Sequence, residues 1–246
     1  MCCEGRENMR INHKNLVEEQ NCICIGRNGN KNEEHSVLLK EHAMDIYTDD
    51  EYYLSVTCTE EYLEELVIGR LVADGRISRM EEISAIKVSE DRSCVDVWTC
   101  EENISSDMEK KAAEIFYPDE WVFCMADTMA EGMPIHDKTW MAHCCFLFRE
   151  NKLLFACEDI SRHNAVDKVI GLAVKNQVKL SECALYTSGR VPLDLVEKIR
   201  ITGIPVLVGK GMPTAQAVEL CRDEKITLIC GARCDRMKVY TDFRGK

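Results

Sequence analysis

Asp159-Ile-Ser-Arg-His-Asn-Ala-Val-Asp-Lys-Val-Ile-Gly171 places a dense polar run directly before an apolar repeat with helical spacing. The repeat predicts a helix over residues 162–174, because its apolar side chains would share one face. Ser161 or Asp159 can cap this helix, since a short side-chain oxygen accepts hydrogen bonds from N–H groups of the first turn. The stretch therefore predicts a polar loop that leads into a helix packed on the core.

The first turn of this helix is a candidate anion site. Arg162, His163 and Asn164 occupy it, and Asp167 and Lys168 follow one turn later. Backbone N–H groups and the helix dipole favour negative charge at the amino end of a helix. Each residue taken alone is compatible with an ordinary capped helix in solvent. The whole run favours a site that recognises a phosphate together with a hydrogen-bonding ring.

Strands and helices alternate around and beyond this run. Strands are expected at 142–148, 152–156, 184–187, 205–208 and 226–229, and helices at 192–202 and from 213 to about 223. Pro192 suits the first turn of its helix, and Gly203 ends that helix. The alternation predicts a largely parallel sheet with helices on both faces.

Ligands of such sheets bind beyond the carboxyl ends of the strands. Four polar loops are expected to gather there, at 159–164, 188–190, 209–214 and 231–236. Glycine in three of them lets the backbone approach a ligand closely. The basic residues of these loops are Arg162, Arg190, Lys210, Arg233 and Arg236. Polar loops are common in α/β folds, but four basic ones on an acidic chain indicate an anionic, nucleotide-like ligand.

The amino-terminal half has a different pattern. Residues 1–33 are rich in Asn, Lys and Glu without a clear period, and we expect a flexible arm. A strand at 36–47 with a partner at 52–57, a helix at 60–71 and a hairpin of 83–88 with 94–99 predict a small α+β subdomain over 34–103. Helices at 104–115 and 122–131 would open an α/β domain over 104–246.

Composition limits the class of protein. The chain has 246 residues, of which 46% are hydrophobic and 30% charged, which is typical of a soluble globular protein with one large domain or two small ones. A formal net charge of −12 argues against a general nucleic-acid or anionic-membrane surface. No apolar run reaches the roughly 18 residues of a membrane span, and residues 1–20 lack a signal-peptide core. We therefore expect a cytoplasmic protein.

The 15 cysteines are scattered, and no Cys-x-x-Cys pair occurs. A disulfide framework is not expected in a cytosolic protein, so most thiols should be buried. His143-Cys144-Cys145 with Cys157, or Cys230 with Cys234, stay open as metal ligands, although zinc sites prefer paired spacings. A zinc hydrolase of the deaminase type would need His-x-Glu and Pro-Cys-x-x-Cys runs, and the chain has neither.

Several motifs beyond the opening stretch resemble one family. They are Ser188-Gly189-Arg190, Gly203-Ile204-Pro205 and Pro213-Thr214-Ala215, with 64–71 and 74–77 upstream. Over roughly residues 36 to 242 the chain resembles the FdhD family of formate dehydrogenase accessory sulfurtransferases, also described as sulfur carrier proteins.

The resemblance implies a cytidine-deaminase-like α/β fold, which is a three-layer sandwich, and a homodimer. It implies that the chain binds a molybdenum (or tungsten) bis(molybdopterin guanine dinucleotide) cofactor as cargo, for which GDP or GMP would be mimics. It also implies that persulfide sulfur passes from a cysteine desulfurase to this cofactor, before insertion into formate dehydrogenase. The four loops would then hold guanine and phosphate groups.

The expected cofactor-binding residues all lie in or beside these loops. They are Asp159, Ser161, Arg162, His163, Asn164, Asp167, Lys168, Ser188, Gly189, Arg190, Lys210, Pro213, Thr214, Gly231, Ala232, Arg233, Cys234, Asp235 and Arg236.

The chain departs from the family in the part linked to sulfur transfer. The family's Cys-x-x-Cys loop is missing, and 98–111 contains only Cys100. The family's Thr-Gly-Gly-x-His run has Trp140 and Met141 in place of both glycines. The persulfide candidates that remain are Cys100 and the pair Cys144 and Cys145 beside His143, although 145–148 resembles a buried strand. The alternative is a non-catalytic carrier or chaperone that binds the cofactor without sulfur transfer.

Overall fold

Three β-sheets form the framework of the computed structural model, which describes residues 15–100 and 112–245. A hairpin comprises β1 (Val17–Ile25) and β2 (Lys31–Leu39). A four-stranded sheet of order β4-β3-β6-β5 comprises β3 (His42–Thr48), β4 (Glu51–Cys58), β5 (Ile83–Val88) and β6 (Cys94–Thr99). A six-stranded sheet of order β12-β11-β10-β9-β7-β8 comprises β7 (His143–Arg149), β8 (Lys152–Asp159), β9 (Cys183–Thr187), β10 (Val206–Gly209), β11 (Thr227–Arg233) and β12 (Arg236–Thr241).

The α-helices of the described residues are α1 (Leu63–Ala73), α2 (Asp119–Ala130), α3 (Pro134–Thr139), α4 (Arg162–Lys175), α5 (Leu193–Thr202) and α6 (Ala215–Asp223). Short 3₁₀ turns lie at Met80–Glu82 and Leu180–Glu182. None of these described helices combines the length and the apolar character that crossing a membrane requires.

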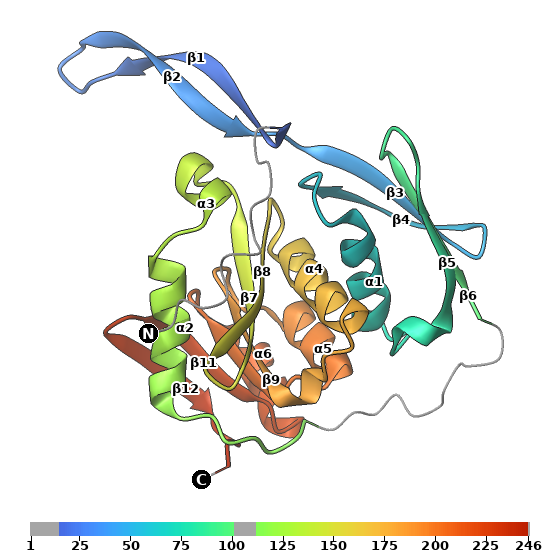
Figure 1. Ribbon diagram of the computed structural model, residues 1–246. Coiled ribbons are helices and arrows are strands. Elements are labelled where there is room, and N and C mark those ends of the chain that lie inside the picture. Colours follow the sequence, from blue (N-terminus) through green and yellow to red (C-terminus); the bar gives the residue numbers. More distant parts are fainter. Residues whose placement is uncertain (1–14, 101–111, 246) are drawn as a thin grey trace.

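Alternating side chains give the six-stranded sheet a core on each face. Along β7, Leu147 joins the core under α4, α5 and α6, whereas Phe146 and Phe148 join the core under α2. Strand side chains point alternately to opposite faces, so one apolar strand supplies both cores. Figure 1 shows the resulting layers, with α2 on one side of the sheet and α4 and α5 on the other. The expected coverage of both faces is confirmed.

The expected largely parallel sheet is wrong. Only β9, β10 and β11 run parallel, whereas β7 is antiparallel to β8 and β9, and β12 is antiparallel to β11. Parallel neighbours need crossover connections, and here α5 and α6 supply them. The two-residue turn at 150–151 and the tight turn after Arg233 make hairpins instead, and β12 was not predicted.

The four-stranded sheet is joined to the larger unit by a close crossing of α1 and α4. A Cβ atom on Gly69 would overlap the backbone carbonyl of Asp167, and one on Gly171 would overlap that of Glu65. Only glycine permits two helix backbones to approach this closely. The crossing fixes the small sheet against the helix that begins at Arg162.

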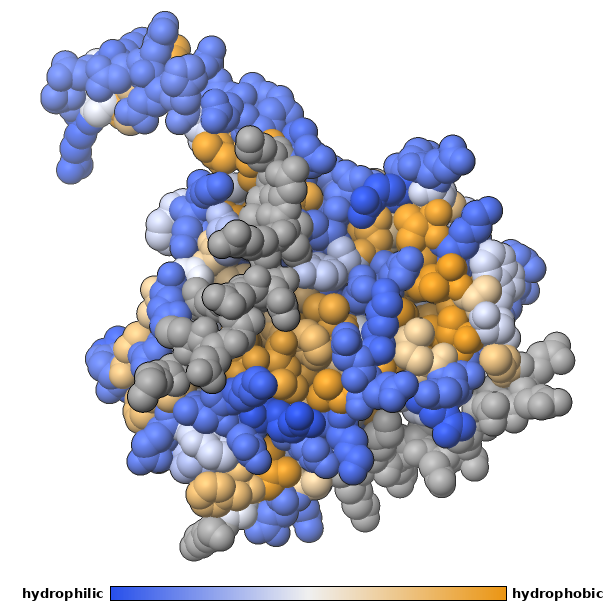
Figure 2. Space-filling view, viewed as in Figure 1, coloured by the Kyte–Doolittle hydropathy of each residue, from blue (hydrophilic) through white to orange (hydrophobic). Residues whose placement is uncertain are grey.

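The part of the expected flexible arm that is described differs from the prediction, and residues 1–14 lie outside the described residues. Residues 17–39 form the β1–β2 hairpin, which projects from the body (Figure 1). Leu16 and Leu39 at its base pack with Ile135 and Ala142, while its far end is exposed. Figure 2 shows a mainly hydrophilic hairpin surface on this face of the molecule, with hydrophobic residues gathered over the middle of the body.

Some of the other expected elements are confirmed and others differ from the structure. The 83–88 and 94–99 hairpin is confirmed with the same bounds, and the expected 36–47 strand is divided between β2 and β3. Most of the helix expected at 104–115 falls outside the described residues, and 112–115 is not helical. The boundaries at 34 and 104 between arm, subdomain and domain stay a prediction.

Candidate functional site

Hydrogen bonds between glycines join the loops that follow β9 and β10 to the end of β11. Gly211 N donates to Gly189 O at 3.1 Å, and Gly231 N donates to Gly211 O at 3.2 Å. A Cβ atom on Gly189 would lie 3.0 Å from Cδ of Arg162, so the loop before α4 is adjacent as well. The four predicted loops therefore gather at one edge of the six-stranded sheet, which we call the loop edge.

Cations and neutral donors gather at the loop edge. Nε of Arg162 is buried and has no hydrogen-bond partner among the described residues. His143 begins β7 at this edge, and burial together with the charge of Arg162 lowers the pKa of His143, with Arg190 adding to the effect. The imidazole of His143 is therefore neutral near pH 7. This combination favours an anion that also presents hydrogen-bonding groups.

Arg233 and Ser188 support the backbone of the loop edge. Nη1 of Arg233 donates to Lys210 O at 2.6 Å and to Ala232 O at 3.0 Å. Oγ of Ser188 accepts from Cys144 N at 2.9 Å. Both side chains thus hold neighbouring strands in place, which leaves Arg162, Arg190 and Lys210 as the side-chain cations for a ligand.

Asp159 is the centre of a buried network before α4. Its Oδ2 accepts from Thr59 N at 3.0 Å and pairs with Nζ of Lys168 at 2.7 Å. Its Oδ1 accepts from Ser161 N at 2.9 Å and from Nδ2 of Asn164 at 3.0 Å. Asp159 and Lys168 are fully buried, so the network shapes the loop and does not face a ligand, contrary to our expectation.

The expected side-chain cap of α4 is wrong. Ser161 takes the cap position, but no described side chain caps the helix, because the carboxylate of Asp159 accepts from the N–H of Ser161 itself. The first-turn N–H groups of α4 thus remain without a side-chain cap beside the unpartnered Nε of Arg162. Both features favour negative charge at this point.

Two further predicted residues join α4 to α5. Asp167 is 1% exposed, and both of its oxygens lie 2.6 Å from Nζ of Lys198. Nε2 of His163 lies 3.4 Å from Oδ2 of Asp194. Burial lowers the pKa of His163 to about 4 despite Asp194, so His163 is neutral near pH 7 and the contact is no ion pair. Asp167 therefore holds the helix in place and does not face a ligand at the loop edge.

Glu158, which precedes Asp159, holds α3 on the opposite face of the sheet. Its carboxylate accepts from Ile135 N at 3.0 Å and from His136 N at 2.6 Å, and burial raises the pKa of Glu158. Sequence reasoning missed Glu158, Thr59 and Lys198, because their partners lie 22 to 109 positions away in the chain. The only local signal was a pair of acidic residues at the end of a β-prone segment.

The turn between β11 and β12 carries the last predicted residues. Gly231, Ala232 and Arg233 belong to β11 and not to a loop. At the tip, Arg236 is largely exposed and lies 3.8 Å from Asp235, and Sγ of Cys234 lies 3.9 Å from Ala126 O in α2. Pro213 and Thr214 precede α6, and Oγ1 of Thr214 caps it by accepting from Ala217 N at 3.3 Å.

The persulfide candidates do not have the exposure that the chemistry needs. Cys144 and Cys145 are fully buried, and burial raises the pKa of each thiol, whereas persulfide chemistry requires an accessible thiolate. Cys100 follows β6 in the other sheet, where it lines a cavity of about 290 Å³ with residues that include Asp49 and Arg76. The structure does not bring Cys100 to the loop edge.

The metal alternatives also lose support. Cys145 and Cys157 lie opposite each other on β7 and β8, in the core under α4, whereas Cys144 lies in the core under α2. The sheet therefore separates Cys144 from the other two cysteines that were considered as metal ligands with His143. Among residues 15–100 and 112–245, no three His, Cys, Asp or Glu side chains gather as metal ligands.

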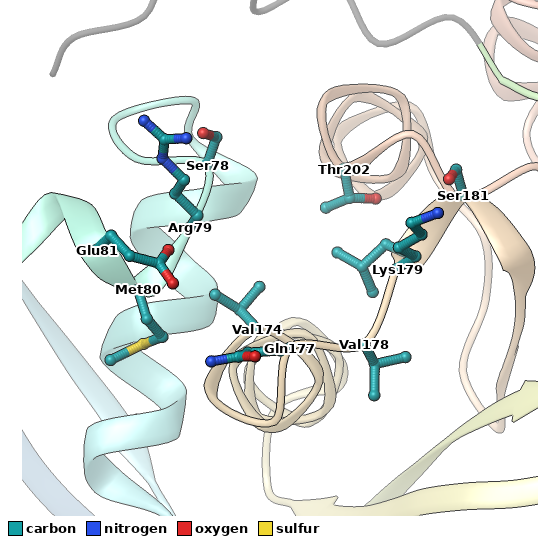
Figure 3. Close-up of a pocket in the computed structure, with 11 residues that line it drawn as sticks. Ser78, Arg79, Met80, Glu81, Val174, Gln177, Val178, Lys179, Ser181 and Thr202 are labelled. Atoms are coloured by element: carbon teal, nitrogen blue, oxygen red, sulfur yellow. The ribbon is translucent and has the colours of Figure 1, made fainter.

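A hollow of about 430 Å³ lies at the other end of α4 (Figure 3). Val174 and Gln177 line it near the end of α4, with Arg79 and Lys179 on either side. The 14 residues of α4 separate it from Arg162 by roughly 20 Å. Arg79 is 55% exposed and pairs with Glu82 at 3.3 Å, and among the described residues that line this hollow no buried side-chain N or O atom is without a hydrogen-bond partner. The loop edge is the stronger candidate.

The chain is similar to known proteins over most of its length. The model of the FdhD/NarQ family matches residues 39–116 and 100–245. Protein FdhD of Methanocaldococcus jannaschii is 29% identical over 221 residues, covering 83% of this chain and 88% of that protein. The sulfur carrier protein FdhD of Listeria monocytogenes is 23% identical over 243 residues, covering 87% and 93%.

A solved structure is similar throughout. It is a crystal structure described as a formate dehydrogenase accessory protein of Desulfotalea psychrophila, with a TM-score of 0.82 and 26% identity, covering 92% of this chain and 97% of that one. The family model matches well over half of the residues, including all four loops of the loop edge. The chain therefore belongs to the FdhD/NarQ family.

Proposed function

We propose that this protein binds a molybdopterin guanine dinucleotide cofactor at the loop edge and serves in the maturation of a formate dehydrogenase. The observation that carries the proposal is Arg162, whose buried Nε has no partner among the described residues at the uncapped start of α4. A guanidinium whose Nε is buried without a partner, on a chain of net charge −12, favours an anion. Relatives described as sulfur carrier and formate dehydrogenase accessory proteins support the biological setting.

The residues at the loop edge suit such a cargo. Arg162, Arg190 and Lys210 would balance phosphate charge, and the close packing of Gly189 on Arg162 and of Gly211 on the backbone of Arg190 brings their loops together. The neutral ring of His143 would accept or donate one hydrogen bond to a polar heterocycle. Asp159 and its buried partners would keep the start of α4 in position. The metal, molybdenum or tungsten, would arrive with the cargo.

The sulfur step would use a thiolate of this chain. The thiolate attacks the outer sulfur of a persulfide on a cysteine desulfurase, a new S–S bond forms, and the desulfurase thiolate leaves. In the second transfer this S–S bond would break, the thiolate of this chain would leave, and the outer sulfur would pass to the cargo as sulfide, with two electrons supplied by the reduced cofactor. A second candidate is a carrier that binds the cofactor without sulfur transfer, and the complete burial of Cys144 and Cys145 favours it. Sulfur acceptance by single Cys→Ala variants separates the two, since a pure carrier accepts none.

The finer architectural expectations belong to the same proposal. A mixed six-stranded sheet between α2 and the layer of α4, α5 and α6 supports a cytidine-deaminase-like sandwich. A homodimer in the cytoplasm is proposed from the resemblance to the family.

Calorimetric titration with GDP tests the cofactor site. The wild type should bind GDP, and Arg162→Ala should weaken binding by at least about tenfold, because a charge-assisted contact to phosphate is lost. Arg79→Ala is the matched control, since Arg79 lies in the hollow of Figure 3 at the far end of α4. Absence of GDP binding by the wild type would refute the proposal.

A further inference from the structure

Trp140 is exposed and has an unfavourable backbone conformation. It ends α3 with φ of 57° and ψ of 10°, the left-handed region that favours glycine. Its side chain is among the most exposed apolar groups of the described residues, at 79%, and the adjacent Met141 is 54% exposed. An indole in water on a left-handed backbone is disfavoured on both counts, and such features cluster at ligand sites.

The indole is held in place beside the loop edge. The ring of His136 lies 5.8 Å from that of Trp140, and Nδ1 of His136 lies 2.7 Å from Ala142 O. Glu158 fixes the start of the same helix through two backbone N–H groups. Trp140 precedes His143 by three residues, which extended chain spans in at most roughly 10 Å. The backbone of Trp140 therefore lies within roughly 10 Å of that of His143, whose imidazole senses the charges of Arg162 and Arg190.

We propose that Trp140, flanked by Met141, is the stacking surface for the guanine ring of a nucleotide whose phosphates contact Arg162, Arg190 and Lys210. The inference rests on the proposed function and adds Trp140 as the residue that contacts the guanine ring of the ligand. Aromatic side chains stack on nucleobases through their π faces, whereas cations hold phosphates. The chain places the two kinds of group on adjoining segments, α3 and the loops of the sheet. A nucleoside diphosphate has the same two parts in one molecule.

Calorimetry with two ligands separates stacking from phosphate binding. Trp140→Gly should weaken GDP roughly 5- to 150-fold, the range for losing one base–aromatic stack, and leave inorganic pyrophosphate unchanged. Trp140→Phe should retain most of the GDP affinity. Trp140→Gly should not lower Tm, because glycine adopts the left-handed conformation without strain. Tyr52→Ala, which removes another exposed aromatic ring, on β4, is the control and should change neither ligand.

Each other outcome overturns the inference in a distinguishable way. Unchanged GDP affinity in Trp140→Gly, with weakened binding in Arg162→Ala, would leave the proposed function standing and remove the stacking role. Equal weakening of GDP and pyrophosphate would show a purely structural role for Trp140. A change of oligomeric state with intact GDP binding would assign the indole to a protein surface. If the wild type binds neither ligand, the proposed function fails and this inference fails with it.

Discussion

Buried charges at single positions hold the start of α4 in place. Lys168 is completely buried and contacts the carboxylate of Asp159 at 2.7 Å and Oγ1 of Thr59 at 2.6 Å. Since Thr59 follows β4 and Asp159 ends β8, one ammonium group links the small sheet to the loop edge. An isolated charge in such a place is costly, so each partner depends on the other.

Lys168→Met should therefore destabilise the protein by about 3–5 kcal/mol in urea unfolding, because it leaves the carboxylate of Asp159 buried without a cation. Lys179→Met is the control, since Lys179 is 76% exposed beside Glu182 and its pair should contribute about 0–1 kcal/mol. Adding Asp159→Asn to Lys168→Met should recover part of the loss. Equal effects of the two lysine variants would contradict a role for the buried pair.

His163 should make stability depend on pH. Its folded pKa is lowered to about 4, chiefly by burial, against about 6.5 in an unfolded chain. Between these values the unfolded state binds the proton more readily, so stability falls as pH falls through this window. The full shift would correspond to roughly 3 kcal/mol at about 1.4 kcal/mol per pKa unit, and solvent screening of the partly exposed ring reduces the effect below that value.

Urea unfolding at several pH values between 7 and 4 measures this dependence. His163→Asn should flatten it, because asparagine does not titrate. His35→Asn, on the exposed surface of β2, should leave the dependence as it is. An unchanged slope in His163→Asn would show that other groups cause the loss at acidic pH.

The packing of α1 on α4 reverses the usual preference of helices for alanine. Alanine in place of a helical glycine ordinarily stabilises by about 1 kcal/mol. At Gly171 the added Cβ would overlap the carbonyl of Glu65 in α1, so the helices must separate. We expect Gly171→Ala to destabilise by about 1–3 kcal/mol or more in urea unfolding.

Gly245→Ala is the matched control for this crossing. A Cβ atom at Gly245 would meet its nearest atoms at 3.6 Å, an ordinary contact, so stability should change little. A Gly171→Ala variant as stable as the wild type would contradict the close contact between the backbones of α1 and α4.

The segments that the sequence predicted well are those with local patterns. The β5–β6 hairpin alternates apolar and polar residues across a polar turn, and α4 has apolar residues at helical spacing, so both were found. The β1–β2 hairpin was missed because its strands are mostly polar and exposed, without one apolar face. The relative direction of β7 and β9 depends on sheet order, and no short window of sequence contains that information.

At the candidate site, the sequence located the loops but not the role of each side chain. Basic residues and glycines after β-prone segments correctly indicated that the loops before α4 and after β9 and β10 meet, whereas most of the fourth predicted loop belongs to β11 and β12. The carboxylate of Asp159 contacts Thr59, which lies 100 positions away in the chain. A local sequence pattern does not contain this contact, so the prediction that Asp159 faces a ligand was wrong. Trp140 was noticed only as a departure from the family, and its exposure and backbone conformation required the structure.

The thiols of the described residues range from exposed to buried, with Cys94, Cys100 and Cys124 between the two. Those of Cys22, Cys24 and Cys234 are exposed, and seven others are buried, at Cys58, Cys144, Cys145, Cys157, Cys183, Cys221 and Cys230. Brief treatment of the native protein with N-ethylmaleimide, followed by peptide mass analysis, should label the exposed three and spare the seven until urea is added. Cys2 and Cys3 lie outside the described residues.

The same division predicts the result of sulfur loading by a cysteine desulfurase. Cys144→Ala and Cys145→Ala should accept as much sulfur as the wild type, because a buried thiol with a raised pKa does not attack a persulfide. Loss of sulfur acceptance in either variant, with unchanged Tm, would show that the interior of the sheet opens to a partner.

The last two residues of β8 give this family member an evolutionary constraint. Glu158 holds α3 on one face of the sheet and Asp159 holds the start of α4 on the other. Inserting or deleting a single residue within β8 would exchange the two faces and misplace both segments at once. Insertions and deletions among homologous sequences should therefore be rare in β8 and more frequent in exposed turns with few tertiary contacts, such as residues 26–30.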